Sequence, residues 1–406
     1  MVVSVLSCAA MAVARAFEVL LVAIRLGLTS FGGPVAHLGY FRDEYVTRRR
    51  WLDDDAYADL VALCQLLPGP ASSQVGIAVG MHRAGLPGGI AAWVGFTAPS
   101  AAALILFGYG VSAFDYLVVQ GWLRGLKVVA AAVVAFALLG MARNLAPDAR
   151  RATIAVAAAI AMLLWRTPLA QVLVIVVAAA AGRLLLQGVV SPAVAGTPNV
   201  RARPFAAVAS LALFVVLLGG LPILRQFVTS DPLDVFDAFY RSGSLVFGGG
   251  HVVLPLLQAE VVPPGWVTGE QFIAGYGAAQ AVPGPLFTFS AYLGTVMDGP
   301  VGGWSGGLFA LVAIFLPSFL LVAGILPFWE RLRSIAALRA AIAGVGAAVV
   351  GLLLAALYDP VWTTAIRTPP DLALGLAAFA MLAWWKVPPW LVVLAGSAAG
   401  AAITAL

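Results

Sequence analysis

The chain has 406 residues, of which 62% are hydrophobic and 10% are charged, and its mean hydropathy is +1.00. This composition leaves too little polar surface to cover a water-soluble globule of this size, so we expect the chain to lie in a lipid bilayer. The net charge of +5 comes from basic residues in short loops, a pattern that does not indicate nucleic-acid binding. The two cysteines give neither a disulfide framework nor a metal-ligand spacing, and we expect no metal or cofactor.

Apolar segments recur along the whole chain, each about long enough to cross roughly 30 Å of hydrocarbon. The first six lie near residues 16–34, 57–80, 86–110, 123–142, 152–165 and 168–187. A further segment covers Phe205–Pro222, and counterparts of the first six follow between 232 and 406. The apolar start, Met1–Ala14, lacks a basic region and a cleavage site, so we expect no cleaved signal. The sequence therefore predicts an all-α polytopic membrane protein.

The two series of six segments are related in sequence. Residues 25–34 (RLGLTSFGGP) match residues 241–250 (RSGSLVFGGG), and residues 51–70 match residues 266–285. Two even-numbered units joined by one crossing have opposite orientations in the membrane, as in many secondary transporters. We therefore predict an N-terminal repeat over 1–190, a connector with one transmembrane helix over 191–228, and an inverted repeat over 229–406.

Basic residues in the loops distinguish two topologies. Simple alternation puts the Arg42–Arg50 cluster on the opposite side from Arg83 and spreads loop Lys and Arg almost evenly between the two sides. If the first two segments of each half are re-entrant, the cluster joins the basic majority, as the positive-inside rule expects. We therefore favour re-entrant segments, with the N-terminus in the cytoplasm.

Two Pro-Gly-Pro sequences interrupt apolar segments at matched places, Pro68-Gly69-Pro70 and Pro283-Gly284-Pro285. Two prolines and a glycine remove backbone donors and favour non-helical geometry, so a break is expected at each. Non-helical backbone at membrane depth is tolerated only where protein or a water-filled cavity satisfies it. Paired breaks therefore indicate a transport site, whereas the alternative is a pair of kinks that only shape packing.

Polar residues beside both breaks suit an anion. The helices that follow the breaks would offer free N–H groups and a positive dipole end. Hydroxyl and amide side chains, together with glycine turns, would add donors. These residues are Phe31, Gly32, Gly33, Gln65, Ser72, Ser73, Gln74, Phe247, Gly248, Gly249, Gln280, Thr288 and Ser290.

Arginines inside apolar segments are costly, and they normally face a partner or a substrate. Arg25 and Arg241 are such a matched pair. In one interpretation they oppose the two charges of a dianion. In the other they form internal salt bridges with Glu18 and Asp234, which lie seven residues earlier on the same helical face. Arg124 and Arg339 are the next matched arginines.

Two matched pairs of acids are candidates for proton coupling, because carboxylates near a dehydrated site can have raised pKa values. They are Glu44 with Glu260, and Asp55 with Glu270. We expect the Asp53–Asp55 run to cap a helix as well. Three histidines without matched partners are interpreted as packing or loop residues: His37, His82 and His251.

The strings TSFGGPVAHLGYFRDEYV (29–46) and LCQLLPGPASSQ (63–74), with echoes at 247–257 and 278–290, closely resemble the chromate transporter (CHR) family in its long two-domain form. The resemblance implies an oxyanion carrier that expels chromate across the bacterial cytoplasmic membrane, confers resistance and draws on the proton motive force. The signature positions are Phe31, Gly32, Gly33, Pro34, His37, Gln65, Pro68, Gly69 and Pro70. In the second half Gly250 replaces the proline and no histidine matches His37.

Other functions stay open at this level. Sulfate has the same charge and tetrahedral shape as chromate, so the chain could carry sulfate or another tetrahedral oxyanion, in either direction. An anion channel is compatible with re-entrant breaks, but channels more typically assemble from rings of subunits. A lipid-phosphate enzyme is disfavoured because Asp53–Asp59 lacks the expected carboxylate spacing. A homodimer is left open.

Overall fold

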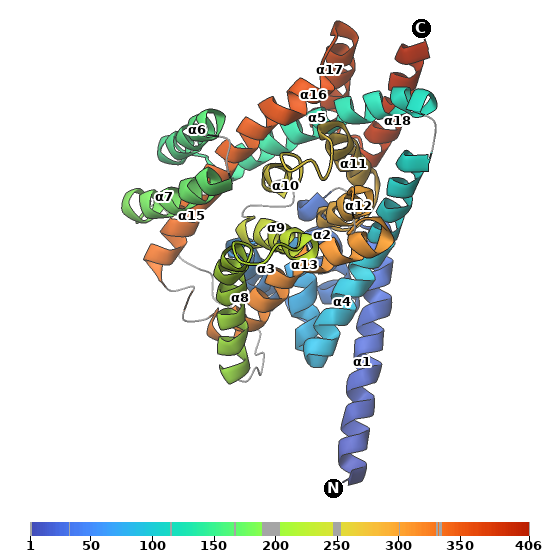
Figure 1. The fold of residues 1–406 in the computed structure, drawn as a ribbon. Helices are drawn as coiled ribbons and strands as arrows, with labels where there is room; N and C mark the ends of the chain where they lie inside the picture. The colour runs from blue at the N-terminus through green and yellow to red at the C-terminus, as the bar shows by residue number, and fades with distance from the viewer. Residues whose placement is uncertain are drawn as a thin grey trace.

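The computed structural model describes residues 2–31, 33–113, 116–165, 168–188, 204–246, 253–299, 301–329, 332 and 335–405. Every regular element in these ranges is a helix, and the helices form one packed assembly from which the start of α1 projects (Figure 1). Five stretches are long and apolar enough to cross a membrane: Ala71–Gly110, Gly121–Leu145, Pro204–Leu224, Gly303–Phe328 and Ala336–Ala365. The predicted all-α polytopic membrane fold is confirmed.

In the described residues, the first half consists of seven α-helices and a short π-helical turn, Asp43–Arg48, that follows α2. The helices are α1 (Val2–Thr29), α2 (Gly33–Arg42), α3 (Asp54–Leu66), α4 (Ala71–Ala113), α5 (Tyr116–Leu145), α6 (Ala149–Leu164) and α7 (Pro168–Leu185). Within α4 the chain turns back at Ala84 and Gly85, where Gly85 adopts a φ of 65°. α4 is therefore two arms of a hairpin, whose backbones touch at Gly80 and Gly88.

The second half follows the connecting helix α8 (Pro204–Leu224). Its helices are α9 (Asp231–Leu245), α10 (Val253–Val261), α11 (Gly269–Ala281), α12 (Phe289–Val296), α13 (Gly303–Ile325), α15 (Ala336–Ala356), α16 (Thr363–Ala365), α17 (Pro369–Ala383) and α18 (Pro389–Ala405). α12 and α13 form a hairpin like the two arms of α4, with the backbones of Gly294 and Gly306 in contact.

The last two helices of each half pack against a helix of the other half, an arrangement that exchanges them between the halves. α5 packs along α17 and α18, and α15 packs along α6 and α7 (Figure 1). Small residues allow these backbones to approach closely, as at Gly125 against Gly396 and at Gly182 against Gly344. The sequence repeat did not predict this exchange, because it relates segments by similarity and says nothing of their neighbours.

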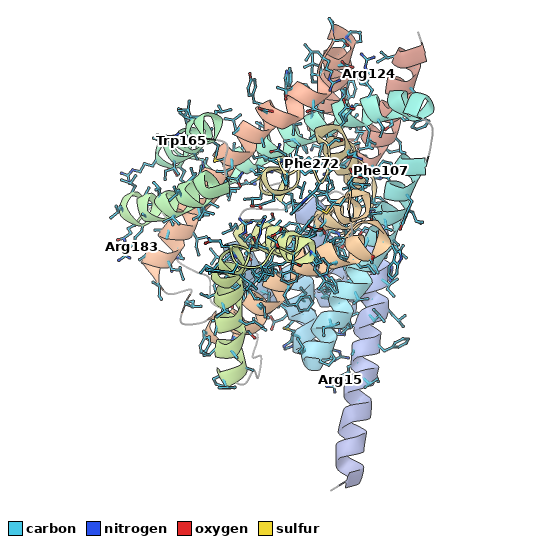
Figure 2. All side chains as sticks on the ribbon, in the orientation of Figure 1. Arg15, Phe107, Arg124, Trp165, Arg183 and Phe272 are labelled. Atoms are coloured by element: carbon cyan, nitrogen blue, oxygen red, sulfur yellow. The ribbon has the colours of Figure 1, made fainter. Side chains whose placement is uncertain are left out.

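The outer surface is apolar, as expected for lipid contact. In α8, Phe205 is 86% exposed and Val216 is 64% exposed, and only 11% of its most apolar stretch is buried. Figure 2 shows the contrast between Phe272, which lies among the central helices and is fully buried, and Trp165, which lies on the outer side at the end of α6. Water would not solvate such a surface, whereas hydrocarbon would.

Candidate substrate site at the two broken helices

The helix breaks at Pro68-Gly69-Pro70, as the sequence predicts. α3 ends at Leu66 and α4 begins at Ala71, and Gly69 adopts a φ of 122° between them. The Gly69 amide donates to the Val246 carbonyl at 2.6 Å. The Gln74 side-chain amide donates to the Pro68 carbonyl at 2.6 Å. The Gly69 N–H and the Pro68 carbonyl are therefore hydrogen-bonded by protein, as non-helical backbone at membrane depth requires.

The second break is bonded in the matching way. Gly284 has a φ of 104°, and its amide donates to the Ser30 carbonyl at 3.0 Å. Ser30 and Val246 each directly precede the Phe-Gly-Gly sequence of their half, so each break is hydrogen-bonded to the residue before that sequence in the other half. A Cβ added to Gly69 would lie 2.8 Å from Ser318 Oγ, and one added to Gly284 would lie 2.7 Å from Ser100 Oγ. Each break is thus hydrogen-bonded to the other half of the chain, and we call the pair the crossed breaks.

Four buried polar atoms without a hydrogen-bond partner belong to residues beside the breaks. Among the described residues, the hydroxyls of Ser30, Ser73 and Thr97 have no partner, although the side chains are at most 3% exposed. The Gln280 amide nitrogen is likewise without a partner. Buried polar groups are nearly always bonded, so these four donors indicate a place for a ligand. Thr97 was missed by the sequence analysis, although it lies one turn before Ser100.

Backbone donors add to this set at the start of α4. The first helical hydrogen bond there runs from the Gln74 amide to the Pro70 carbonyl at 2.9 Å. The amides of Ala71, Ser72 and Ser73 precede it and have no place in the helical ladder. They form the positive end of the helix dipole, where an anion is stabilised.

Several predicted site residues are less available than expected. The Thr288 and Ser290 hydroxyls donate to the carbonyls of Pro285 and Phe287 at 2.7 and 2.8 Å, so neither is a free donor. The Ser72 hydroxyl lies 3.3 Å from His37 Nδ1. His37 is buried and packs edge-on against Phe96, as a packing histidine does.

Other predicted positions surround the breaks or lie outside the described residues. Gln65 is exposed at the end of α3, and the ring of Phe31 lies 5.7 Å from that of Trp390 in α18. Gly33 has a φ of 76° and open space beside it. Gly32, Phe247, Gly248, Gly249 and His251 lie outside the described residues.

The matched arginines bind the matched glutamates. Arg25 lies 3.8 Å from Glu44, and Arg241 lies 2.9 Å from Glu260. Arg241 also contacts Asp237 at 2.8 Å. The partners Glu18 and Asp234 that the salt-bridge interpretation gave them are wrong. Glu44 lies in the π-helical turn after α2, and Arg241 binds Asp237, one turn earlier on α9, together with Glu260 on α10, which helical spacing from Arg25 and Arg241 did not identify.

Glu18 and Asp234 bind other arginines. Glu18 accepts from Arg49 at 3.1 Å and from Arg83 at 3.0 Å. Asp234 accepts from Arg225 at 2.6 Å. Arg225 also donates to Asp237 at 2.6 Å, so a network of two arginines and three acids forms around α9.

The matched glutamates, which lie outside the five candidate spans, differ in pKa. Burial opposes ionisation of Glu44, but the hydrogen bond and charge of Arg49, with the charges of Arg25 and Arg48, hold the pKa of this carboxyl below its ordinary value. Burial raises the pKa of Glu260, and the nearby charge of Asp237 adds to this rise, so that Arg241 offsets it only in part.

The remaining predicted carboxylates are more exposed. Glu270 is bound by Arg367 at 2.9 Å and lies 3.7 Å from Lys127. Asp55 is exposed, and the cap of α3 is Asp53, whose side chain accepts from the Ala56 amide at 2.8 Å. Arg124 donates to buried Asp371 at 2.7 Å, which is a structural pair between α5 and α17.

The ion pairs of Glu18 bear on the topology of the first half. Because Arg49 and Arg83 bind one carboxylate, the chain between them leaves and returns to the same place. The second half has an equivalent contact, where the Asp298 amide after α12 donates to the Trp266 carbonyl before α11 at 3.3 Å. This geometry favours re-entrant segments and disagrees with simple alternation, which separates Arg49 from Arg83.

Comparison with known proteins places the chain in a family. The family model described as Chromate transporter matches the chain twice, over residues 17–183 and 233–401. The Chromate transport protein of Pseudomonas aeruginosa is 29% identical over 394 residues, which cover 93% of this chain and 90% of that protein.

Two further relatives match along nearly the whole chain. The Chromate transport protein of Cupriavidus metallidurans is 26% identical, covering 92% of this chain and 90% of the relative. The Probable chromate transport protein of Synechococcus elongatus is 25% identical, covering 93% of each chain. No solved structure matches the chain. With both halves matched by its model, the chain belongs to the chromate transporter family.

Proposed function

We propose that the protein is a secondary transporter that exports chromate from the bacterial cytoplasm across the inner membrane, uses the proton motive force, and so confers chromate resistance. The observation that carries the proposal is the group of partnerless donors at the crossed breaks, on Ser30, Ser73, Thr97 and Gln280. Membership of the family and the names of the relatives support chromate as the substrate.

A tetrahedral dianion suits these donors chemically. Each of its oxygens accepts hydrogen bonds, and the available groups are hydroxyls, an amide and the first N–H groups of a helix. Because these groups carry no full charge, they hold the anion without trapping it. Conduction and transport both require binding that is weak enough to release.

The crossed backbone bonds provide a way to alternate access. In an inverted pair of repeats, one break faces each side of the membrane. Opening the bond between Gly69 and Val246 would expose the site on one side while the bond between Gly284 and Ser30 stays closed, and the reverse state would expose the other side. A carrier requires the two states to have similar energies, and the matching of the two breaks supports this.

We assign proton coupling to Glu260 among the four candidate carboxylates. Among the described residues, its network holds the three acids Asp234, Asp237 and Glu260 against the two arginines Arg225 and Arg241, which leaves one negative charge in excess. Asp237 is fully buried and binds both arginines, so the excess charge falls on Asp234 and Glu260, and an uncompensated charge that is largely buried is costly. One bound proton neutralises the network. Glu44, with Arg48 and Arg49 beside it, has no such excess.

The test is uptake of radiolabelled chromate into inside-out vesicles, with and without a proton gradient and with competing sulfate, molybdate or phosphate. The proposal predicts gradient-dependent uptake that excess sulfate inhibits weakly, and Glu260→Gln should abolish the gradient dependence while uptake down a chromate gradient continues. Asp55→Asn is the matched control. Stronger competition by sulfate than by unlabelled chromate would make the protein a sulfate transporter. Uptake that is insensitive to the gradient and does not saturate would indicate a channel.

A further inference from the structure

A cleft of about 510 Å³ lies beside α1, at the turn between the arms of α4. It is lined by Glu18, Arg25, Glu44, Arg48, Arg49, Arg50, Trp51 and Arg83. Five arginines against two glutamates leave an excess of three positive charges. A cleft with one sign of charge concentrates counter-ions, so this feature attracts anions.

Two of the arginines form a fixed wall of the cleft. Arg49 and Arg83 both bind Glu18, at 3.1 and 3.0 Å. Their guanidinium carbons lie 5.5 and 5.3 Å from the centre of the Trp51 ring, within the range of cation–π attraction. These contacts hold the positions of both charges.

The other three arginines are available to a ligand. The Arg25 and Arg48 side chains are 58% and 59% exposed, and they reach Glu44 only at 3.8 and 3.5 Å. Arg50 is exposed and has no ion pair within the part of the chain that the structure describes.

Arg50 also has a backbone conformation that glycine adopts more readily than arginine. Its φ is 52°, and the Trp51 amide bonds back to the Tyr45 carbonyl at 2.8 Å, which makes Arg50 the residue just beyond the helix end. Glycine is favoured there because a side chain is strained at positive φ. An arginine at a glycine position indicates a use for its charge.

We propose that this arginine cleft is a docking site for a tetrahedral dianion, separate from the broken helices and loaded before them. The identity of the ligand rests on the proposed function. Ten residues of α4 separate Ser73 from Arg83, about 15 Å along a helix, so one small anion cannot contact both places. The cleft raises the local anion concentration at one entrance.

Among the residues that the structure describes, this docking site is present in one half only. In the second half, Arg241 and the neighbouring connector residue Arg225 bind three acids, so this region has an excess of negative charge. The two entrances therefore differ in charge, and anions load preferentially from the arginine side. With the Arg42–Arg50 cluster in the cytoplasm, as the loop charges predict, this preference favours export.

The test uses the full chain with Arg48→Gln and Arg50→Gly, singly and combined, and Arg143→Gln as a control that removes one exposed charge elsewhere. Arg50→Gly relieves the positive φ, so the thermal midpoint should hold or rise. We expect the KM for chromate, added on the arginine side, to rise about fivefold for each change, with kcat unchanged and a weaker dependence on salt. A KM equal to wild type in the double variant would overturn the docking site.

A phosphate headgroup of an anionic lipid has the same chemistry as the free oxyanion, and vesicle composition separates the two. The KM effect should persist in vesicles of phosphatidylcholine alone. An effect confined to vesicles that contain phosphatidylglycerol would overturn oxyanion docking in favour of a lipid site. If wild type transports no chromate, the proposed function fails by itself. Equilibrium binding of radiolabelled sulfate to the purified chain then decides the cleft, because the double variant should lose one binding site per chain, and unchanged stoichiometry would refute it.

Discussion

Arg25 and Arg241 occupy matched positions, yet the structure predicts very different consequences for their removal. Arg241 is 18% exposed and binds Asp237, which is fully buried, and Glu260, which is 13% exposed. Arg241→Ala leaves Glu260 unpaired and Asp237 with Arg225 alone. Breaking a buried ion pair by removing one partner costs about 3–5 kcal/mol. Arg25 is 58% exposed at 3.8 Å from Glu44, which keeps Arg48 and Arg49, so Arg25→Ala should cost about 0–1 kcal/mol.

The assay is reversible unfolding of the purified chain in mixed micelles, compared between the two single variants. The double variant Arg241→Ala with Glu260→Gln serves as a rescue, because it removes the charge left without a partner. It should recover more than half of the loss. Adding Glu44→Gln to Arg25→Ala should give no recovery, because Glu44 is not left unpaired. Equal destabilisation by the two single variants would refute the assignment of one pair as exposed and the other as buried.

Three further predictions test the breaks, the glutamates and the topology. Gly69→Ala and Gly284→Ala should each lower the free energy of unfolding by about 2–5 kcal/mol and abolish transport, because a side chain at their φ values of 122° and 104° is strained and overlaps Ser318 or Ser100. Gly39→Ala is the control, because Gly39 has open space beside it and the variant should fold normally. An unfolding assay in which both changes are tolerated would contradict the break geometry. The pKa of Glu260 is raised in the folded protein, so its contribution to stability is fully present below its ordinary pKa of 4.5 and is lost as the pH rises through the folded-state pKa. The pKa of Glu44 is lowered in the folded protein, so its contribution is present above 4.5 and is lost as the pH falls through the folded-state pKa. Glu260→Gln and Glu44→Gln should therefore change the slope of unfolding free energy against pH with opposite signs and in different windows, and slopes that change alike would refute the assignment. Single cysteines beside Arg48 and at Ala84, in a chain without Cys8 and Cys64, should both be protected from an impermeant thiol reagent added outside; labelling of one alone would restore simple alternation.

Sequence reasoning predicted the features that depend on composition and on local sequence patterns. The low polarity predicted the membrane fold, the two Pro-Gly-Pro sequences predicted the breaks, and the matched positions identified Arg25 with Arg241. It failed for contacts between elements. The bond from Gly69 to Val246 joins residues far apart in the chain, and helical spacing could not show that Arg25 faces Glu44 rather than Glu18. Thr97 was missed because a threonine in an apolar helix has no local signal, and its importance comes from the neighbours that the fold gives it.

The central claim is that the crossed breaks form the substrate site. Replacing Pro68-Gly69-Pro70 by three alanines allows α3 to continue into α4 and removes the N–H groups of Ala71, Ser72 and Ser73 from the site. The most direct measurement is radiolabelled chromate uptake by inside-out vesicles that contain equal amounts of inserted wild type and variant. The account predicts that the variant inserts and transports no chromate, and the same for Pro283-Gly284-Pro285. Near-normal uptake by either variant would contradict it and reduce the breaks to kinks in the packing.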